Sequence, residues 1–243
     1  MDLDGRTAVV TGGAVRVGGA ITRELARRGA SVFIHYNRSA APAEVLRREI
    51  ADAGGIAAIG SVDLSNPETA ADLIDAAAAS LGPPTILVNS ASAFPFDSID
   101  DVTLDGYRAA QNLTLVTPLL LTQAFAKRVP DDLGGAIVNV TDVKTTRPYT
   151  KHLSYMLAKG GIDTLTRASA LALAPKIRVN AVALGVILPP SDEDDDYAER
   201  LAAELPLRRV GGAQVVADAV VFLCENDFIT GEIVRVDGGG HLV

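Results

Sequence analysis

Two residues four positions apart, Tyr155 and Lys159, have the clearest chemical potential in this sequence. On a helix this spacing places both side chains on one face, where they can meet a common ligand. A phenol with a pKa of about 10 is a poor acid–base catalyst at neutral pH, but a neighbouring ammonium is expected to lower that pKa. The spacing is therefore typical of a proton-transfer pair. It also arises by chance, as a solvated lysine beside a half-buried tyrosine.

The chain around this pair alternates short apolar runs with longer helical patterns. This alternation predicts a parallel sheet covered by helices on both faces, in which ligands collect at the carboxyl ends of the strands. Strands are expected at 7–10, 31–36, 57–62, 85–88, 136–140, 177–183 and 233–236. Helices are expected from the glycine turn to 28, then at 42–53, 66–81, 104–128, from the Tyr155 region to 174, and at 197–204 and 213–225.

Composition limits the classes of protein to which the chain can belong. Its 243 residues are 48% hydrophobic and 21% charged, which suits one compact α/β domain over 1–243. The net charge of −8 argues against nucleic acid or an anionic membrane as the main partner. No signal-peptide pattern or membrane-length apolar run is seen, so we expect a cytoplasmic protein. A single cysteine, Cys224, leaves no disulfide framework or cysteine-rich metal site, and no metal is expected.

A glycine-containing turn at 11–19 follows the first expected strand and leads into a helix. Without Cβ atoms, its backbone N–H groups can approach a pyrophosphate at the helix N-terminus. We expect Gly12, Arg16 and Val17 to contact a dinucleotide there. The alternative is a strand-to-helix turn that needs glycine for its geometry alone.

The segment after the second expected strand indicates which dinucleotide is bound. An enzyme that selects NAD usually has an acidic residue here for the ribose 2′-hydroxyl, whereas a 2′-phosphate requires arginine and hydroxyl donors. The segment contains no acidic residue and offers His35, Asn37, Arg38 and Ser39, with Arg16 as a second cation. NADP(H) is therefore the predicted cofactor, and solvated surface arginines are the alternative.

Further candidates follow the third and fourth expected strands. Asp63 can accept from an adenine amine while Leu64 covers the ring. After the fourth strand, small and polar residues would let a cofactor lie close to the backbone: Asn89, Ser90, Ala91 and Ser92. The aromatic residue Phe94 follows them and is either a plate on which a ligand stacks or a core residue.

The ordered set of motifs resembles the short-chain dehydrogenases/reductases over nearly the whole chain. The matching pieces are Thr11-Gly12-x3-Arg16-x-Gly18, Asp63-Leu64, Asn89-Ser90-Ala91, Tyr155-x3-Lys159 and Val236-Asp237-Gly238-Gly239. The resemblance implies an α/β Rossmann fold of one domain, with a doubly wound seven-stranded parallel sheet and usually a homotetramer. It implies that Tyr155 donates or accepts the proton, that Lys159 binds the nicotinamide ribose and lowers the Tyr155 pKa, and that Asn112 holds a water near the lysine. Gly185, Val186 and Ile187 would face the nicotinamide carboxamide.

At two positions the sequence departs from the general family pattern, and at both it resembles the pteridine reductases and the dihydromonapterin reductases. Arg16 replaces a usual glycine, and Asp142 replaces the usual catalytic serine thirteen residues before the tyrosine. That resemblance implies a pterin-like substrate contacted by Arg16, Ser92, Phe94, Asp142 and Tyr155, with the Phe94 ring stacked on it. A carboxyl group beside a phenol can relay a proton to a ring nitrogen, whereas a serine hydroxyl suits a carbonyl oxygen.

Three functions are left open by the sequence. The first is an NADPH-dependent pteridine reductase, with Asp142 and Tyr155 handling the proton. The second is a carbonyl reductase of the same family, acting on a 3-oxoacyl, sugar or steroid ketone, and the third is a non-catalytic NADP(H)-binding sensor. The acidic run 191–196 is either a substrate lid, which would disfavour polyanionic substrates, or a solvated loop.

Overall fold

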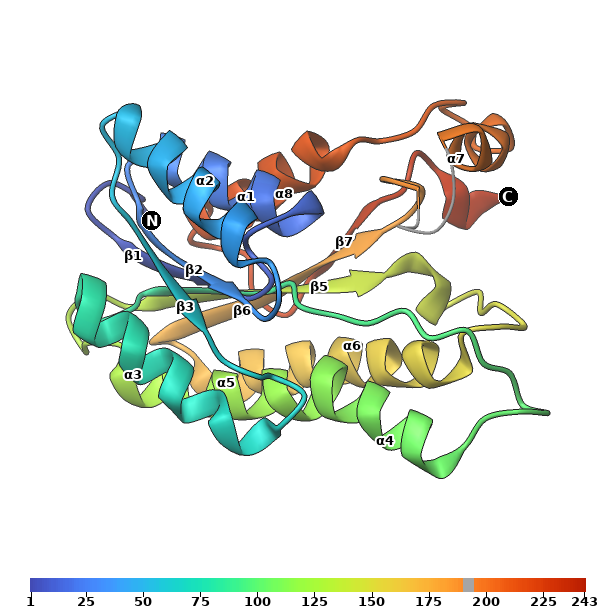
Figure 1. The fold of residues 1–243 in the computed structure, drawn as a ribbon, viewed down its shortest axis with the longest axis horizontal. Helices are drawn as coiled ribbons and strands as arrows, with labels where there is room; N and C mark the ends of the chain where they lie inside the picture. Colours follow the sequence, from blue (N-terminus) through green and yellow to red (C-terminus); the bar gives the residue numbers. More distant parts are fainter. Residues whose placement is uncertain (190–194) are drawn as a thin grey trace.

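The structure, a computed structural model, describes residues 1–189 and 195–243. Seven parallel strands form one sheet in the order β3-β2-β1-β4-β5-β6-β7 (Figure 1). The strands are β1 (Thr7–Val10), β2 (Ser31–Tyr36), β3 (Ala57–Ser61), β4 (Ile86–Asn89), β5 (Gly135–Asp142), β6 (Ile177–Leu184) and β7 (Ile233–Val236). The helices are α1 (Arg16–Arg27), α2 (Ala40–Asp52), α3 (Ala70–Leu81), α4 (Leu104–Gln111), α5 (Thr117–Arg128), α6 (Leu153–Leu173), α7 (Asp195–Ala203) and α8 (Ala213–Glu225).

The helices cover the sheet on two faces. Helices α1, α2 and α8 lie on one face, and α3, α5 and α6 lie on the other (Figure 1). The strands supply alternate side chains to the two layers, as a period of two requires. Ala8 and Val10 are buried in the core under α1 and α8, whereas Val9 is buried in the core under α3 and α5. The predicted doubly wound seven-stranded α/β fold is confirmed.

The expected continuous helix over 104–128 is wrong in its middle. Helix α4 ends at Gln111, a π-helical turn spans Asn112–Val116, and α5 then begins at Thr117. Pro118 accounts for the change, because it has no N–H to donate to the carbonyl of Thr114 four residues earlier. Such π-turns inside helical segments occur frequently at functional sites.

A buried chain of polar side chains joins β4, β5 and α6. Asn89 and Asn139 are register partners in the sheet. Asn89 Nδ2 donates to Asn139 Oδ1 at 2.8 Å, and Asn139 Nδ2 donates to Thr166 Oγ1 at 2.9 Å. The helix that carries Tyr155 and Lys159 is therefore tied to the middle of the sheet by side-chain hydrogen bonds.

Two further expectations from the sequence concern membrane-spanning helices and the acidic run 191–196. Within 1–189 and 195–243, no helix has the length and apolar character needed to cross a membrane. Most of the acidic run 191–196, the predicted lid, lies outside the described residues.

Candidate active site

Tyr155 and Asp142 form a hydrogen-bonded pair at the carboxyl end of the sheet. Tyr155 is in the first turn of α6 and only 8% exposed, and Asp142 is the last residue of β5. The phenol of Tyr155 donates to Asp142 Oδ2 at 2.9 Å. Asp142 Oδ1 accepts from the backbone N–H of Lys144 at 2.8 Å, so both carboxylate oxygens have a donor.

Lys159 lies one helical turn further along α6, inside the protein. Its side chain is buried, and Nζ donates to the carbonyl of Val140 at 2.7 Å. Nζ is also 5.5 Å from the centre of the Tyr155 ring. Burial lowers the pKa of Lys159 to about 8, although the charges of Asp142 and Asp163 oppose the shift. The predicted Tyr155–Lys159 face thus exists, with the ammonium held by the end of β5.

Lys159 is not among the groups that set the direction of the Tyr155 pKa in this structure, so its expected lowering of that pKa stays a prediction. Burial, together with the charge of Asp142 and the hydrogen bond to it, raises the Tyr155 pKa well above 10. Burial also raises the pKa of Asp142, against hydrogen bonds from Lys144 and Tyr155 that lower it. At neutral pH Tyr155 therefore carries its proton, which is the form in which the phenol can donate to a substrate.

Asn112 is the first residue of the π-helical turn that packs against α6. Its side chain is half-buried. Gln111, its neighbour, donates through Nε2 to the carbonyl of Ser154 at 3.0 Å, which holds this turn beside the start of α6. That Asn112 positions a water near Lys159 stays a prediction.

The glycine turn between β1 and α1 has the backbone of a phosphate-binding site. Gly12 has a φ of +62°, and a Cβ on Gly18 would lie 2.1 Å from the Gly12 carbonyl oxygen, so neither position admits a side chain without movement. No described side chain caps the N-terminus of α1 at Val15. The first N–H groups of this helix are therefore available to an anion.

His35 holds this turn and is not exposed at its surface. The imidazole is 2% exposed; Nδ1 accepts from the N–H of Gly12 at 3.0 Å, and Nε2 lies 2.8 Å from the Val62 carbonyl. The bonds define a neutral ring with its proton on Nε2, and burial lowers the His35 pKa. The residue predicted to contact the cofactor instead positions the turn that would bind it.

The other residues predicted to bind the adenosine end differ in exposure. Asn37 and Arg38 are exposed just after β2, and Ser39 is half-buried. Asp63 accepts from the N–H and hydroxyl of Ser65, and these bonds lower its pKa. Leu64 is 2% exposed in the core, so its backbone is better placed than its side chain to meet a ligand. Val17 packs against the core under α1.

Two side chains organise the segment after β4, at the point where the strand order reverses. Thr11 Oγ1 accepts from the N–H groups of Ser90 and Ala91 at 2.9 and 3.0 Å, which joins the ends of β1 and β4. The Oδ1 atom of Asn89 is buried and has no hydrogen-bond partner among the described residues. A hydroxyl of a bound cofactor would satisfy it, and this unpaired acceptor supports a dinucleotide at the switch point.

The segment after β6 is fixed by backbone bonds. The carbonyls of Val186 and Ile187 accept from Gly211 and Gly212 at 2.9 and 3.0 Å. A Cβ on Gly185 would lie 2.7 Å from Cα of Asp237. Arg16 adopts a φ of +52° and donates through Nη2 to the carbonyl of Pro189, so it connects the glycine turn to this segment.

An aromatic cluster lies beside Tyr155. The ring of Phe94, 44% exposed, stacks on His152 with centroids 3.6 Å apart and planes at 15°. It also meets the Tyr155 ring edge-on at 4.8 Å. Phe96 and Tyr149 approach His152 at 5.3 and 5.9 Å. Sequence reasoning found Phe94 but missed His152, because nothing in Lys151-His152-Leu153 marks a residue that closes against a distant loop.

Asp97 is a second residue that the sequence did not reveal. Its carboxylate accepts from the N–H of Ser154 at 3.1 Å and from the Ser154 hydroxyl. It therefore caps the N-terminus of α6 from a loop more than fifty residues away. Ser92, predicted to contact substrate, is exposed nearby and lies 3.5 Å from Thr114 through its hydroxyl.

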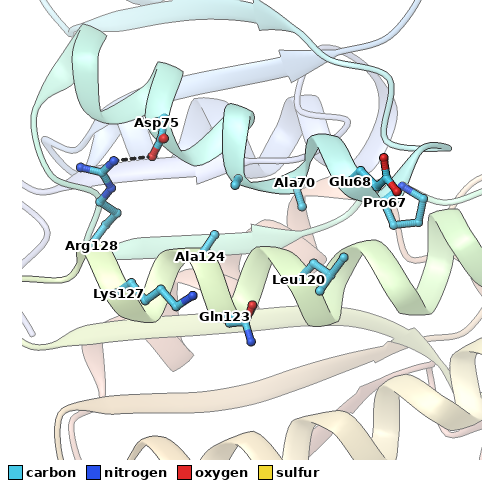
Figure 2. A pocket seen from close by; sticks show the side chains of 10 residues that line it. Pro67, Glu68, Ala70, Asp75, Leu120, Gln123, Ala124, Lys127 and Arg128 are labelled. Atoms are coloured by element: carbon cyan, nitrogen blue, oxygen red, sulfur yellow. Dashed lines mark ion pairs between the residues drawn. The ribbon is translucent and has the colours of Figure 1, made fainter.

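Two cavities in the described part of the chain do not contain the Tyr155–Asp142 pair. One, of about 260 Å³, is lined in part by Val186 and Ile187. The other, of about 380 Å³, lies between α3 and α5 beside the ion pair of Arg128 and Asp75 (Figure 2). The second is lined by residues outside the predicted site, so its presence does not bear on the chemistry.

Comparison with known proteins decides the family. Residues 13–241 match the family model described as enoyl-(acyl carrier protein) reductase. The chain belongs to the short-chain dehydrogenase/reductase family. Members are nicotinamide-dependent oxidoreductases, so this activity follows for the chain, and the observed seven-stranded parallel sheet is the one that the resemblance implied.

Several members of this family are similar to the chain over nearly their whole length. Pteridine reductase 1 of Leishmania tarentolae is 34% identical, covering 97% of this chain and 96% of the relative. A putative ketoacyl reductase of the granaticin polyketide synthase from Streptomyces violaceoruber is 31% identical, with 97% and 96% covered. The crystal structure of the FolM alternative dihydrofolate reductase 1 of Brucella canis, complexed with NADP, has a TM-score of 0.96, at 35% identity and 100% and 96% coverage. The expected resemblance to the pteridine reductases is consistent with the relative from Leishmania tarentolae.

Proposed function

We propose that this protein is an NADPH-dependent pteridine reductase that reduces a ring C=N bond of a dihydropterin. The observation that carries the proposal is the 2.9 Å hydrogen bond from Tyr155 to Asp142. A ketone reductase needs a hydroxyl donor where its carbonyl oxygen becomes an alkoxide. A carboxyl group at this position instead suits the protonation of a ring nitrogen and the binding of ring N–H groups.

The choice of NADP(H) rests on charge and on free backbone donors. Arg38 is exposed beside Ser39 after β2, where a ribose 2′-phosphate would lie. The uncapped N-terminus of α1 would hold the pyrophosphate, and the unpaired Asn89 Oδ1 would accept from a cofactor hydroxyl. The complex of the Brucella canis protein with NADP supports this choice.

When bound, NADPH supplies the hydride that adds to the ring carbon. Tyr155 places its phenolic proton at the ring nitrogen, so that C=N becomes CH–NH with one hydride and one proton added. Asp142 accepts the hydrogen bond of Tyr155 and is positioned to bind a ring N–H or to replace the proton that the phenol gives up. Lys159, with its ammonium next to the Tyr155 ring, offsets the negative charge that develops on the pair.

Reduction of a carbonyl group is the competing activity, because a ketoacyl reductase is among the relatives. Oxidation of NADPH by the purified protein, with a dihydropterin and with 3-oxoacyl, sugar and steroid ketones, separates the two. We expect kcat/KM for the dihydropterin to exceed that for every ketone. A larger value for a ketone would reject the pterin assignment, and cofactor binding without turnover of any substrate would indicate a non-catalytic sensor.

We further propose that residues 1–243 act as one NADP(H)-binding domain that assembles as a cytoplasmic homotetramer. Exposed leucines on two neighbouring helices support association with further copies. Leu119 on α5 is 47% exposed, and Leu157 and Leu171 on α6 are 52% and 85% exposed. Light scattering during size-exclusion chromatography tests the assembly, and a monomeric mass at micromolar concentration would exclude it.

A further inference from the structure

The loop that carries Phe94 is joined to the start of α6 by a set of short contacts. His152 Nδ1 lies 2.9 Å from the Pro95 carbonyl, and the N–H of Leu153 donates to the Asp97 carbonyl at 3.3 Å. The Asp97 carboxylate caps the same helix end through Ser154. Phe94 and Tyr155 therefore belong to two segments, and the contacts that join these segments lie next to both residues.

His152 is the strained member of this junction. Its φ of +61° lies in the left-handed region, which residues with a Cβ rarely adopt. Such a conformation persists where surrounding contacts compensate for it, and it occurs most often at functional sites. The compensating contacts here are the bond to Pro95 and the rings of Phe94, Phe96 and Tyr149.

The position of the imidazole determines how Phe94 can bind a ligand. His152 covers one face of Phe94 at a centroid distance of 3.6 Å, and the Tyr155 ring stands edge-on at 4.8 Å with planes at 88°. Phe94 nevertheless keeps 44% of its surface exposed. The exposed part of the Phe94 ring can therefore meet a planar heteroaromatic ring beside Tyr155.

We propose that His152 is a positioning residue that fixes the Phe94 ring against Tyr155, so that a planar heteroaromatic substrate stacks with its ring nitrogen at the phenol. His152 acts through Phe94 and does not itself touch the reacting atoms. The identity of the substrate rests on the proposed function, whereas the placement of Phe94 does not. The two can therefore be tested separately.

The first test compares His152→Ala with His152→Phe. Removal of the stacked ring in His152→Ala is expected to raise KM for a dihydropterin about tenfold, with a smaller change in kcat, because aromatic pairing is lost. His152→Phe keeps the stack and is expected to restore KM to within about threefold of the wild type. The dissociation constant for NADPH and the Tm stay near the wild-type values in both. Phe228→Ala, whose ring is 97% exposed, is the control for loss of an aromatic elsewhere.

Two outcomes overturn the proposal: an unchanged KM in His152→Ala, or a KM in His152→Phe no better than that in His152→Ala. If the wild type reduces no dihydropterin, the proposed function fails but the positioning role is still tested. Crystal structures of the wild type and His152→Ala with NADP then decide it. A displaced Phe94 ring in the variant supports the proposal, and an unmoved ring overturns it.

Discussion

The phenol of Tyr155 donates a hydrogen bond to Asp142 Oδ2 at 2.9 Å, and this bond favours the charged carboxylate of Asp142 while it disfavours a phenolate on Tyr155. The Asp142 carboxylate opposes a phenolate, which is part of the reason that the pKa of Tyr155 is raised. The two groups therefore act as one unit that carries a proton. This relationship distinguishes the site from one in which a neutral serine faces the tyrosine.

Substitution of Asp142 tests that unit. We expect Asp142→Ser to lower kcat/KM for a dihydropterin at least about 100-fold, because positioned acid–base groups contribute 10²–10⁴-fold. Tyr155→Phe should lose a comparable factor, and the double variant should lose little more, since the two groups act together. Steady-state NADPH oxidation measures all three. Asp131→Asn, at an exposed carboxylate that pairs with Lys176 outside the predicted site, is the control. Intact turnover by Asp142→Ser would reject the role given to the carboxyl group.

Lys159 predicts a pH-dependent stability. Its pKa in the folded protein is about 8, below the ordinary 10.5, so between these values the unfolded chain binds more protons. Wild-type stability should therefore rise relative to Lys159→Met as pH increases from about 8 to about 10, by at most about 3 kcal/mol. Urea unfolding of both proteins across this range gives the difference. A constant difference would mean that Lys159 is not held at a lowered pKa, and activity should be lost in the methionine variant at every pH.

Arg38 is predicted to set the cofactor preference. Arg38→Ala should raise the dissociation constant for NADPH about tenfold or more, because a charge-assisted hydrogen bond to a phosphate is lost. The dissociation constant for NADH should stay nearly unchanged. Quenching or enhancement of nicotinamide fluorescence on binding measures both. Arg48→Ala is the matched control, since Arg48 is exposed on the following helix and pairs with Glu44. An equal loss of affinity for both cofactors in Arg38→Ala would contradict the assignment.

His35 is predicted to act on cofactor affinity through the glycine turn. His35→Phe removes the hydrogen bonds to Gly12 and Val62 and is expected to destabilise the fold by about 2 kcal/mol. The NADPH dissociation constant should rise with it. Because the His35 pKa is lowered, wild-type stability falls as pH drops below about 6.5, where the unfolded histidine takes up a proton. His35→Phe should lack this decline, and an identical acid limb in both proteins would refute the burial argument.

Sequence patterns predicted the strands well because most are short apolar runs that begin just after a glycine or a proline. The π-helical turn at Asn112–Val116 was not predicted because the apolar period runs through it, although Pro118 just after it removes a hydrogen-bond donor. The sequence predicts His35 as a cofactor ligand because it lies at the carboxyl end of β2, whereas the direction of its ring depends on Gly12 and Val62. His152 and Asp97 were missed because both act between segments more than fifty residues apart. The raised Tyr155 pKa depends on burial, which sequence does not give.

The amide chain from Asn89 through Asn139 to Thr166 also constrains folding. A slip of one residue between β4 and β5 would turn one amide to the opposite face and leave the other buried without a partner. Misaligned pairings of these two strands are thereby penalised. Because Thr166 completes the chain from α6, correct strand alignment also sets how far this helix sits along the sheet. The alignment of β4 with β5 therefore helps to set the distance between Asp142 on β5 and Tyr155 on α6.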